Sequence, residues 1–561
     1  MNKLLIIFFT LLIVSSSFGQ IKKSNGYYRF YLSKNIDINQ IDAVLTNLGQ
    51  LNHKSPGWAI WKAINYRDYL TGRNLNNGNV IVYDQGIWLL GKINNVKHGA
   101  VAEWQTTFSP GPIINNQPAM LYNPSDSMKY GIYKITKGDN NDNPDYANWP
   151  VEFGAPIDNL GKPLIKGDQT LWTVFNSADT STLKYFSWFK PNNERNILPI
   201  EIQQLAFARK GNKKDNEDIF SNTVFFEYTI INKGNVNIDS AFIGFWTDID
   251  FQNFSLNPPG VDTAAQVGYC WYNGDESSYH FIHRASPAIG YTLLYGPSVP
   301  AQGENSIYKG RKLNNNKNLP MTSFHGIWDD MTIPLPFDMA ASVDSAWNMA
   351  LGLQSNGQPN IDPTTSKETK FQVSGDPITN TGWVFPKNFT GGGAGFVFFT
   401  GPFNLAPQDT QWVMIALTPA MGNDQFESIK ILRDKANLLR SIPYDSLAYG
   451  TTPYKLNYVD TTNIDDVVES EIIPNKLELS QNFPNPFNPE TTIIFGIQKQ
   501  NYITLKIYDV LGREVKTLVS ENKNAGTYRI HFNSKGLSSG IYFYRLTAGD
   551  FSEIKKMVLL R

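Results

Sequence analysis

The stretch VFFEYTIINKGNVNIDSAFIGFWTDIDF, residues 224–251, decides the fold class of this chain. Its first part, 224–231, is a run of β-branched and aromatic residues, which favour strands. The residues NKGN at 232–235 form a turn signal, and a second run of the same kind covers 241–251. Both runs are largely apolar on both faces, which is typical of strands inside a sandwich. The stretch therefore predicts a β-hairpin in the interior of a β-sandwich.

Similar strand-like runs recur along the chain, and two predicted helices interrupt them. Apolar residues at helical spacing predict a helix over 342–353, and Asp424 with Glu427 forms a capping box before a second helix that reaches Leu439. The repeated βαβ rhythm of a doubly wound sheet is missing. We therefore expect a mainly β fold, with a large β-sandwich-rich N-terminal body and a few helices. The further strand-like runs lie at 80–83, 87–90, 291–295, 395–400 and 412–417.

Composition excludes some classes of function. The 561 residues include 49 Lys and Arg against 50 Asp and Glu, a balance that gives no support to binding of nucleic acid. The single cysteine, Cys270, rules out an intramolecular disulfide. Aromatic residues make up 13% of the chain, which fits large cores and also the faces that bind sugars.

The N-terminus predicts export. Lys3 precedes an apolar run that reaches Val14, and small residues follow as far as Gly19. This order is typical of a secretory signal peptide, here 1–19, and the run is too short to span a bilayer. Because no later segment is long and apolar enough, we expect no transmembrane helix in the mature chain.

Changes in pattern near residue 460 predict the domain boundaries. We expect a β-rich secreted body of one or two subdomains over 20–459 and an exposed acidic linker over 460–476. The remaining block, 477–561, alternates apolar and polar residues over several short strands with turn signals between them. This pattern predicts a small C-terminal β-sandwich of Ig-like type.

The C-terminal block opens with a stiff segment, QNFPNPFNPET, at 481–491. Its three prolines fix φ and remove backbone donors, so an interior strand is excluded and an extended strap is expected. We expect Phe483 and Phe487 to anchor this strap to the small sandwich.

Several motifs of this block, taken in order, resemble one family. They are the entry QNFPNPFNPET, the strand pair ending in LKIYDVLGREVKTL, NAGTYRIHFN, GLSSGIYFYRLTAG and the last strand SEIKKMVLLR. Together they resemble the type A C-terminal sorting domain of cargo proteins of the bacterial type IX secretion system. The body resembles large secreted proteins that carry the same domain, which implies no activity. The motif residues are Phe483, Pro484, Asn485, Pro486, Phe487, Asn488, Pro489, Gly512, Gly540 and Tyr542.

The resemblance implies a route for the protein. Family members cross the inner membrane with a signal peptide and reach an outer-membrane secretion translocon through the C-terminal domain. The cargo is then released, or attached to lipopolysaccharide at the cell surface. The expected location is therefore the cell surface or the medium, reached through the periplasm.

Catalytic motifs are scarce, and one acidic pair is a candidate site. Neither HExxH nor GxxxxGK[ST] occurs. On a strand, Asp248 and Asp250 would share the face of Trp246, where they could bind calcium, act as glycosidase acid and base, or cap the following loop. A second calcium candidate is the loop 137–150, in which Asp139, Asn141 and Asn143 stand at alternate positions but Pro144 replaces the usual glycine. The alternative for this loop is a solvated Asn/Asp turn that binds no metal.

These observations give one main hypothesis and an alternative. The main hypothesis is an exported type IX cargo protein whose body has a non-catalytic role and needs no cofactor, with calcium as the one candidate ion. The alternative is an extracellular glycan-binding or adhesive protein, or a polysaccharide hydrolase acting through Asp248 and Asp250.

Overall fold

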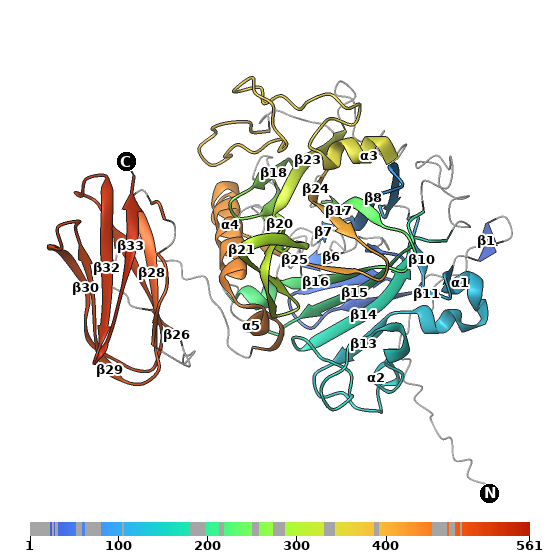
Figure 1. The fold of residues 1–561 in the computed structure, drawn as a ribbon, viewed down its shortest axis with the longest axis horizontal. Coiled ribbons are helices and arrows are strands. Elements are labelled where there is room, and N and C mark those ends of the chain that lie inside the picture. The colour runs from blue at the N-terminus through green and yellow to red at the C-terminus, as the bar shows by residue number, and fades with distance from the viewer. Residues whose placement is uncertain are drawn as a thin grey trace, which may run out of the picture. The chain divides into compact units, whose positions relative to one another are not determined.

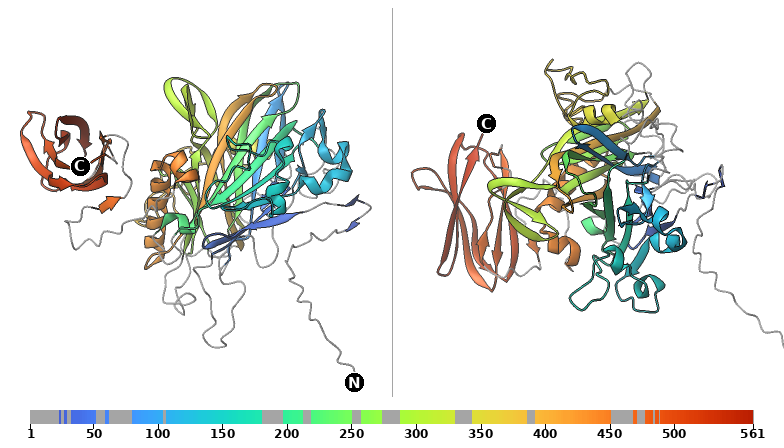
Figure 2. Two further views of the ribbon diagram at one scale, coloured as in Figure 1. Left: turned by 90° about the horizontal axis from the view of Figure 1, so that it is seen from below. Right: turned by 45° about the vertical axis from the view of Figure 1, so that its right-hand side comes forward.

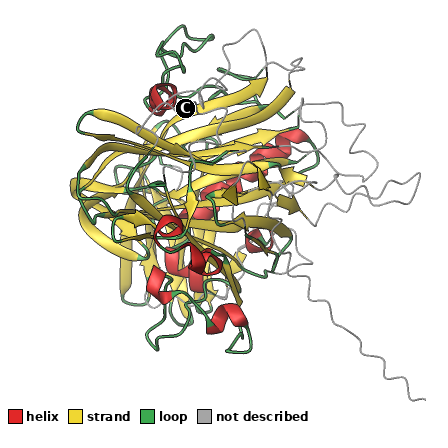
Figure 3. Ribbon diagram, turned by 90° about the vertical axis from the view of Figure 1, so that its right-hand side faces the viewer, coloured by secondary structure: helices red, strands yellow, loops and turns green. Residues whose placement is uncertain are grey.

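The structure is a computed structural model of the whole chain (Figure 1). The residues that it describes are 23–24, 27–28, 32–51, 59–61, 80–103, 106–179, 197–211, 218–249, 257–272, 287–329, 343–385, 392–450, 468–470, 477–482, 485–487 and 489–560. It divides into two compact units, Met1–Leu456 and Asn457–Arg561. Strands dominate both units, which confirms the mainly β fold (Figure 3).

The larger unit, here called the body, is built around a nine-stranded antiparallel sheet, the large sheet (Figures 1 and 2). Its strand order is β10-β14-β15-β16-β25-β20-β19-β18, and β13 pairs with β14. The strands in chain order are β10 Ser109–Pro110, β13 Tyr133–Thr136, β14 Gln169–Asn176, β15 Ile200–Ala208, β16 Val224–Asn232, β18 Pro259–Asp262, β19 Val267–Trp271, β20 Ala288–Tyr295 and β25 Thr410–Ala420.

A six-stranded antiparallel sheet packs against the inner face of the large sheet. Its order is β23-β24-β17-β8-β5, and β9 pairs with β8. The two sheets meet through apolar side chains: the Tyr228 and Phe245 rings lie 5.7 Å apart, and those of Tyr291 and Phe396 lie 6.4 Å apart. The strands are β5 Gln50–Leu51, β8 Asp84–Ile93, β9 Val96–Val101, β17 Ile238–Asp248, β23 Met321–Asp329 and β24 Gly392–Leu405.

The stretch 224–251 forms two strands, as expected, but they do not pair with each other. β16 pairs with β15 and β25 in the large sheet, whereas β17 pairs with β8 and β24 in the six-stranded sheet. The predicted hairpin is therefore wrong, although the turn exists: the Asn232 side chain accepts a hydrogen bond from the amide of Gly234 at 3.0 Å. The chain uses this turn to pass from one sheet of the sandwich to the other.

Helices cover the outer faces of both sheets. α3, Val343–Ala350, packs on the six-stranded sheet, where the rings of Phe242 and Trp347 lie 5.6 Å apart. α4, Gln425–Ser441, and α5, Tyr444–Tyr449, cover the large sheet. The Asp424 carboxylate accepts hydrogen bonds from the amides of Phe426 and Glu427, which confirms the predicted cap. Both predicted helices are thus confirmed.

The remaining elements of the body are short. A four-stranded sheet consists of β3 Ser33–Ile36, β4 Ile41–Thr46, β6 Ala59–Trp61 and β7 Val80–Val82. Three separate pairs are β1 Lys23–Ser24 with β2 Tyr27–Tyr28, β11 Ile113–Ile114 with β12 Gln117–Pro118, and β21 Ser298–Tyr308 with β22 Arg311–Asn318. The short helices are α1 Ala119–Tyr122, η1 Pro124–Tyr130, α2 Pro144–Ala147, η2 Val151–Phe153 and η5 Ile219–Asn222.

The smaller unit contains two four-stranded antiparallel sheets, in the orders β26-β31-β28-β27 and β30-β29-β32-β33. One apolar core takes side chains from both sheets, so the unit is a small β-sandwich. β26 lies inside the range predicted as an acidic linker, and the rest of 460–476 is outside the described residues. The strands are β26 Val468–Ser470, β27 Glu478–Leu479, β28 Glu490–Ile497, β29 Asn501–Tyr508, β30 Glu514–Lys523, β31 Gly526–Asn533, β32 Gly540–Ala548 and β33 Phe551–Leu559.

Candidate ligand-binding site

A pocket of about 330 Å³, here called the hairpin pocket, opens on the outer face of the large sheet. Its floor is one row of side chains across three strands, because Trp172 of β14 pairs with Leu205 of β15, which in turn pairs with Glu227 of β16. Gln203 and Thr229 form the next pair along the same face. Side chains alternate between the two faces of a strand, so these residues point away from the sandwich core.

Three other segments form the walls of the hairpin pocket. The loop between η2 and β14 contributes Lys166, the tip of the β21–β22 hairpin contributes Lys309, and α5 contributes Tyr444. A volume of this size lies within the range of small-ligand sites. The other described residues of the walls are Gly154, Pro156, Leu164, Tyr308, Arg311 and Tyr449.

A buried ion pair links the floor to the walls. The Lys166 ammonium donates to both carboxylate oxygens of Glu227 at 2.8 Å and to the Tyr444 hydroxyl at 2.7 Å. Tyr444 donates to Glu227 Oε1 at 3.0 Å, and the Trp412 indole donates to Oε2 at 3.1 Å. The Lys166 and Glu227 side chains are 5% and 3% exposed. Four hydrogen bonds thus hold the Glu227 carboxylate in place.

This network limits the chemistry that the pocket can perform. Glu227 is occupied by strong donors, so it is poorly placed to take a proton from a ligand. Burial, followed by the charge of Glu227, raises the pKa of Tyr444 far above its usual value, so its hydroxyl stays protonated. Both groups therefore act as fixed parts of the pocket wall rather than as proton acceptors.

The hairpin tip brings two cations to the pocket. Lys309 has a φ of +48° and Gly310 one of +82°, so both residues of this tight turn are left-handed. A side chain at Gly310 would come within 2.8 Å of Asp445 and Tyr444, so glycine is required where the tip meets α5. A two-residue hairpin turn of this kind requires positive φ at both central residues, so the turn itself fixes the backbone of Lys309 beside the pocket. Arg311, the second cation, is exposed.

The surroundings of Lys309 lower the pKa of its ammonium group. Burial of the ammonium in the pocket wall lowers the pKa of Lys309 to about 8; Glu227 opposes this shift, and Lys166 adds a smaller like-charge effect. The residue keeps much of its surface in solvent, which limits this lowering of the pKa. Lys309 is therefore mainly a cation at neutral pH.

None of these pocket residues was singled out from the sequence. The one signal was Glu227, a lone acid within the apolar run 224–231, because a buried charge needs a partner. Its partners are remote in sequence: Lys166 lies 61 residues away and Tyr444 lies 217 residues away.

Asp248, one of the two acidic residues proposed from the sequence, does not line the hairpin pocket. Asp248 lies at the end of β17, opposite Asp84 of β8, and Asp250 is outside the described residues. Burial, and then the charge of Asp84, raises the pKa of Glu103 to about 8. Asp84 and Glu103 are 0% and 9% exposed. Within the described residues, no group of three or more His, Cys, Asp or Glu side chains is placed to hold a metal ion.

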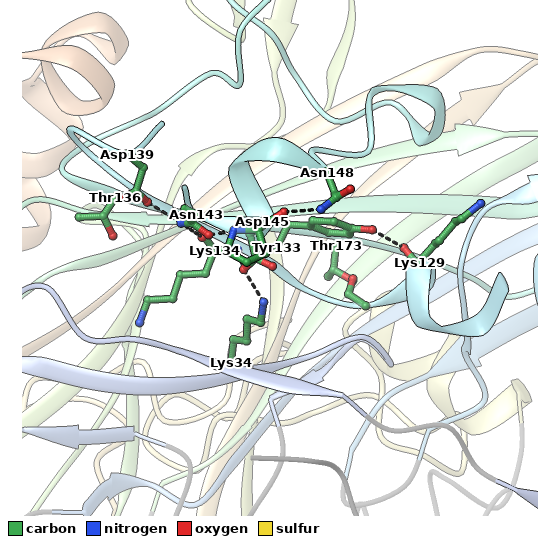
Figure 4. A network of polar contacts seen from close by, with 12 residues as sticks. Lys34, Lys129, Tyr133, Lys134, Thr136, Asp139, Asn143, Asp145, Asn148 and Thr173 are labelled. Carbon is green, nitrogen blue, oxygen red and sulfur yellow. Dashed lines mark hydrogen bonds and ion pairs between the residues drawn. The ribbon is translucent and has the colours of Figure 1, made fainter. Parts of the chain in front are cut away.

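The loop 137–150 uses its acidic oxygens within the protein (Figure 4). The Asp139 carboxylate accepts hydrogen bonds from the Thr136 amide at 2.7 Å and from the Asn143 side chain at 2.6 Å. Asn143 Oδ1 caps α2 at the Asp145 amide, and Asp145 pairs with Lys34. This arrangement favours the turn interpretation over a calcium loop.

The strap of the smaller unit is anchored to β33. The Phe487 ring is 2% exposed in the core, and its backbone N–H donates to Val558 O at 2.9 Å. The Asn485 side chain donates to Lys556 O and accepts from the Val558 amide, so it pairs with β33 as a peptide group would. Phe483, Pro484 and Asn488 lie outside the described residues.

Three more motif residues lie at turns and in the core of this unit. Gly512 has a φ of +75° in the turn after β29, and Gly540 begins β32. Tyr542 is 9% exposed, and its hydroxyl donates to Ser538 O at 2.9 Å. Residues 481–560, which hold the strap and these motifs, match the family described as the secretion system C-terminal sorting domain.

The smaller unit is a type IX secretion sorting domain. This domain implies the secretion machinery as a partner and export to the cell surface or the medium. Within the described residues, no helix is long and apolar enough to cross a membrane.

The other comparisons say little about the body. No curated protein matches the chain. One solved structure that matches is a polysaccharide lyase, with 9% sequence identity and a TM-score of 0.19. The match covers 85% of this chain and 47% of the lyase, so the chain spans about half the length of that protein. A likeness at this level carries no argument about fold or activity.

Proposed function

We propose that the protein is a secreted cargo whose body binds acidic carbohydrate in the hairpin pocket. One observation carries this proposal: Lys309 and Arg311 line the pocket, and neither forms an ion pair with an acidic side chain among the described residues, because Glu227, the one lining carboxylate, is paired with Lys166. The ion pair of Lys166 and Glu227 cancels its own charge, so the pocket is left positive. Aromatic rings of Tyr308 and Tyr449 beside these cations can stack on a sugar ring.

The same residues favour binding over catalysis. A hydrolase needs a carboxylic acid and a carboxylate on either side of the scissile bond. Among the described lining residues of the hairpin pocket, Glu227 is the one carboxylate, and four hydrogen bonds already occupy it. A hydrolase acting through Asp248 and Asp250 stays an alternative prediction, for a region outside this pocket.

The binding proposal predicts a selective effect of the hairpin cations. Replacing Lys309 and Arg311 together by alanine should weaken binding of tetragalacturonate at least about tenfold, because a hydrogen bond to a charged group contributes roughly 1.5–3 kcal/mol. Isothermal calorimetry on the purified chain measures this effect. Lys312→Ala is the matched control, since Lys312 lies on the same hairpin, pairs with Ile307 and lines neither described pocket.

Equal binding by the wild type, the double variant and Lys312→Ala would contradict the proposal, and so would binding of neutral glycans alone. Release of new reducing ends from the tetramer would instead support a hydrolase. Lys309→Arg gives a further control, because arginine stays charged at every accessible pH.

Binding should also depend on pH. The groups around Lys309 are Lys166, Glu227, Tyr308, Tyr444 and the rim residue Asp445. The anion needs the protonated ammonium, so affinity should be highest below pH 8 and should fall as the pH rises through the Lys309 pKa of about 8. In Lys309→Arg this loss should disappear, which calorimetry at pH 6.5 and 9 can measure.

Export should depend on the sorting domain. A chain that lacks 477–561 should stay in the periplasm, because the translocon finds its cargo through this domain. Cell fractionation with an antibody against the body measures where the chain accumulates, and the full chain serves as the control. Normal release of the truncated chain would contradict this part of the proposal.

A further inference from the structure

A second pocket, here called the rim pocket, lies beside the hairpin pocket. It has a volume of about 340 Å³, and Tyr449 of α5 lines both pockets. Tyr449 is 46% exposed, so its ring is accessible to a ligand. The other described lining residues are Lys137, Gly167, Asp168, Arg209, Lys210, Gly211, Asp218, Phe220 and Gly450.

A short backbone segment separates the two pockets. Lys166 lines the hairpin pocket, and its neighbours Gly167 and Asp168 line the rim pocket. The Gly167 amide donates to Ala448 O at 2.6 Å, which ties this segment to α5 next to Tyr449. A side chain at Gly167 would come within 2.5 Å of Ala208 O, so only glycine allows this close approach. The chain therefore passes directly from one pocket to the other, and contacts with α5 and β15 hold this segment in place.

The rim pocket is also positively charged. Lys137, Arg209 and Lys210 line it, against Asp168 and Asp218. Protein donors already engage both carboxylates: Asp168 accepts from the Lys210 amide at 2.8 Å, and Asp218 accepts from the Phe220 amide at 3.1 Å. Asp168 also forms a long ion pair of 3.8 Å with Lys137, whose side chain is 65% exposed, so the Lys137 ammonium stays accessible to a ligand. The Arg209 guanidinium stacks on Phe220 at 3.8 Å, so its position is fixed by packing.

We infer that the two pockets are adjacent subsites of one groove and that the ligand is an acidic oligosaccharide. Its chain passes over Tyr449, with one acidic sugar near Lys309 and Arg311 and another near Lys137 and Lys210. This inference rests on the proposed binding function and adds a minimum length to the ligand. Once one sugar of the oligomer is bound, binding of the next sugar is intramolecular, so the oligomer should bind much more tightly than its monomer.

The test compares galacturonic acid with tetragalacturonate on the full chain by calorimetry. A tetramer can place any of its sugars in a single subsite, which gains only about fourfold, so a gain of more than about tenfold requires a second subsite. We expect that larger gain in the wild type. Replacing both Lys137 and Lys210 by alanine should remove most of this gain. Tyr449→Ala should also reduce the gain, and Tyr449→Phe should reduce it far less, because phenylalanine keeps the ring. Lys312→Ala is again the control.

The outcomes separate the two proposals. If the monomer and tetramer bind with a difference of fourfold or less, and the Lys137 and Lys210 variant matches the wild type, the two-subsite groove is wrong and the binding function stands. If neither ligand binds, both proposals fail. If a neutral tetrasaccharide shows the same length dependence, the inference that the second subsite recognises an acidic sugar is wrong.

Discussion

Replacing Glu227 by alanine should lower the free energy of unfolding of the body by about 3–5 kcal/mol. The variant leaves the Lys166 ammonium buried, with its side chain 5% exposed and without its carboxylate partner. It also removes the acceptor of the Tyr444 hydroxyl and the Trp412 indole. Because several buried donors lose their acceptor at once, the cost exceeds that of a single hydrogen bond. Urea unfolding followed by tryptophan fluorescence measures the change.

Two variants control for this effect. Glu304→Ala breaks a 4.0 Å contact with Lys317 in which both side chains are exposed, so it should cost less than about 1 kcal/mol. Lys166→Met combined with Glu227→Leu replaces the ion pair by apolar side chains and should restore the part of the lost stability that is due to the unpaired Lys166 ammonium, whereas Tyr444 and Trp412 still lack their acceptor. A Glu227→Ala variant as stable as Glu304→Ala would show that the ion pair is not needed for the fold.

The sequence predicted features that depend on neighbouring residues. The capping box at Asp424 was predictable because its donors and acceptor lie within three residues of one another. The turn after Asn232 was predictable for the same reason. Strand and helix periodicities are local too, which is why both predicted helices and the mainly β fold are confirmed.

The pairing of β16 and β17 could not be predicted from the same pattern. Both strands are buried on both faces, because helices cover the outside of each sheet. An apolar run of this kind fits either sheet equally well, so its alternation does not select a partner. The turn at 232–235 looks the same whether the chain forms a hairpin or crosses to the other sheet.

The hairpin pocket could not be predicted from the sequence for a related reason. Lys166 comes from a loop, Glu227 from a strand and Tyr444 from a short helix, and 278 residues separate the first from the last. Patterns of neighbouring residues do not predict that these segments meet. The order of strands in the large sheet brings them together. A lone acid in an apolar run does signal a buried partner, but the sequence leaves that partner unnamed.

Replacing Phe487 by alanine should lower the free energy of unfolding of the sorting domain by about 3–5 kcal/mol. Its ring is 2% exposed and lies 6.0 Å from the ring of Phe532, so the variant leaves a cavity in the core. The sorting domain is a compact unit separate from the body, so calorimetry of the full chain should show its transition move down by more than about 10 °C while that of the body stays in place.

The position of Phe487 explains why this effect should be confined to the sorting domain. Its backbone N–H and C=O bond to Val558 and Leu560, and its ring enters the core between the two sheets, so the strap closes the small sandwich at β33. Val510→Ala, at a side chain 63% exposed, should change stability by less than about 0.5 kcal/mol. If Phe487→Ala and Val510→Ala unfold alike, the strap does not anchor the domain. A stable sorting domain with its own closing strap can fold whatever body precedes it, which is what a portable export signal requires.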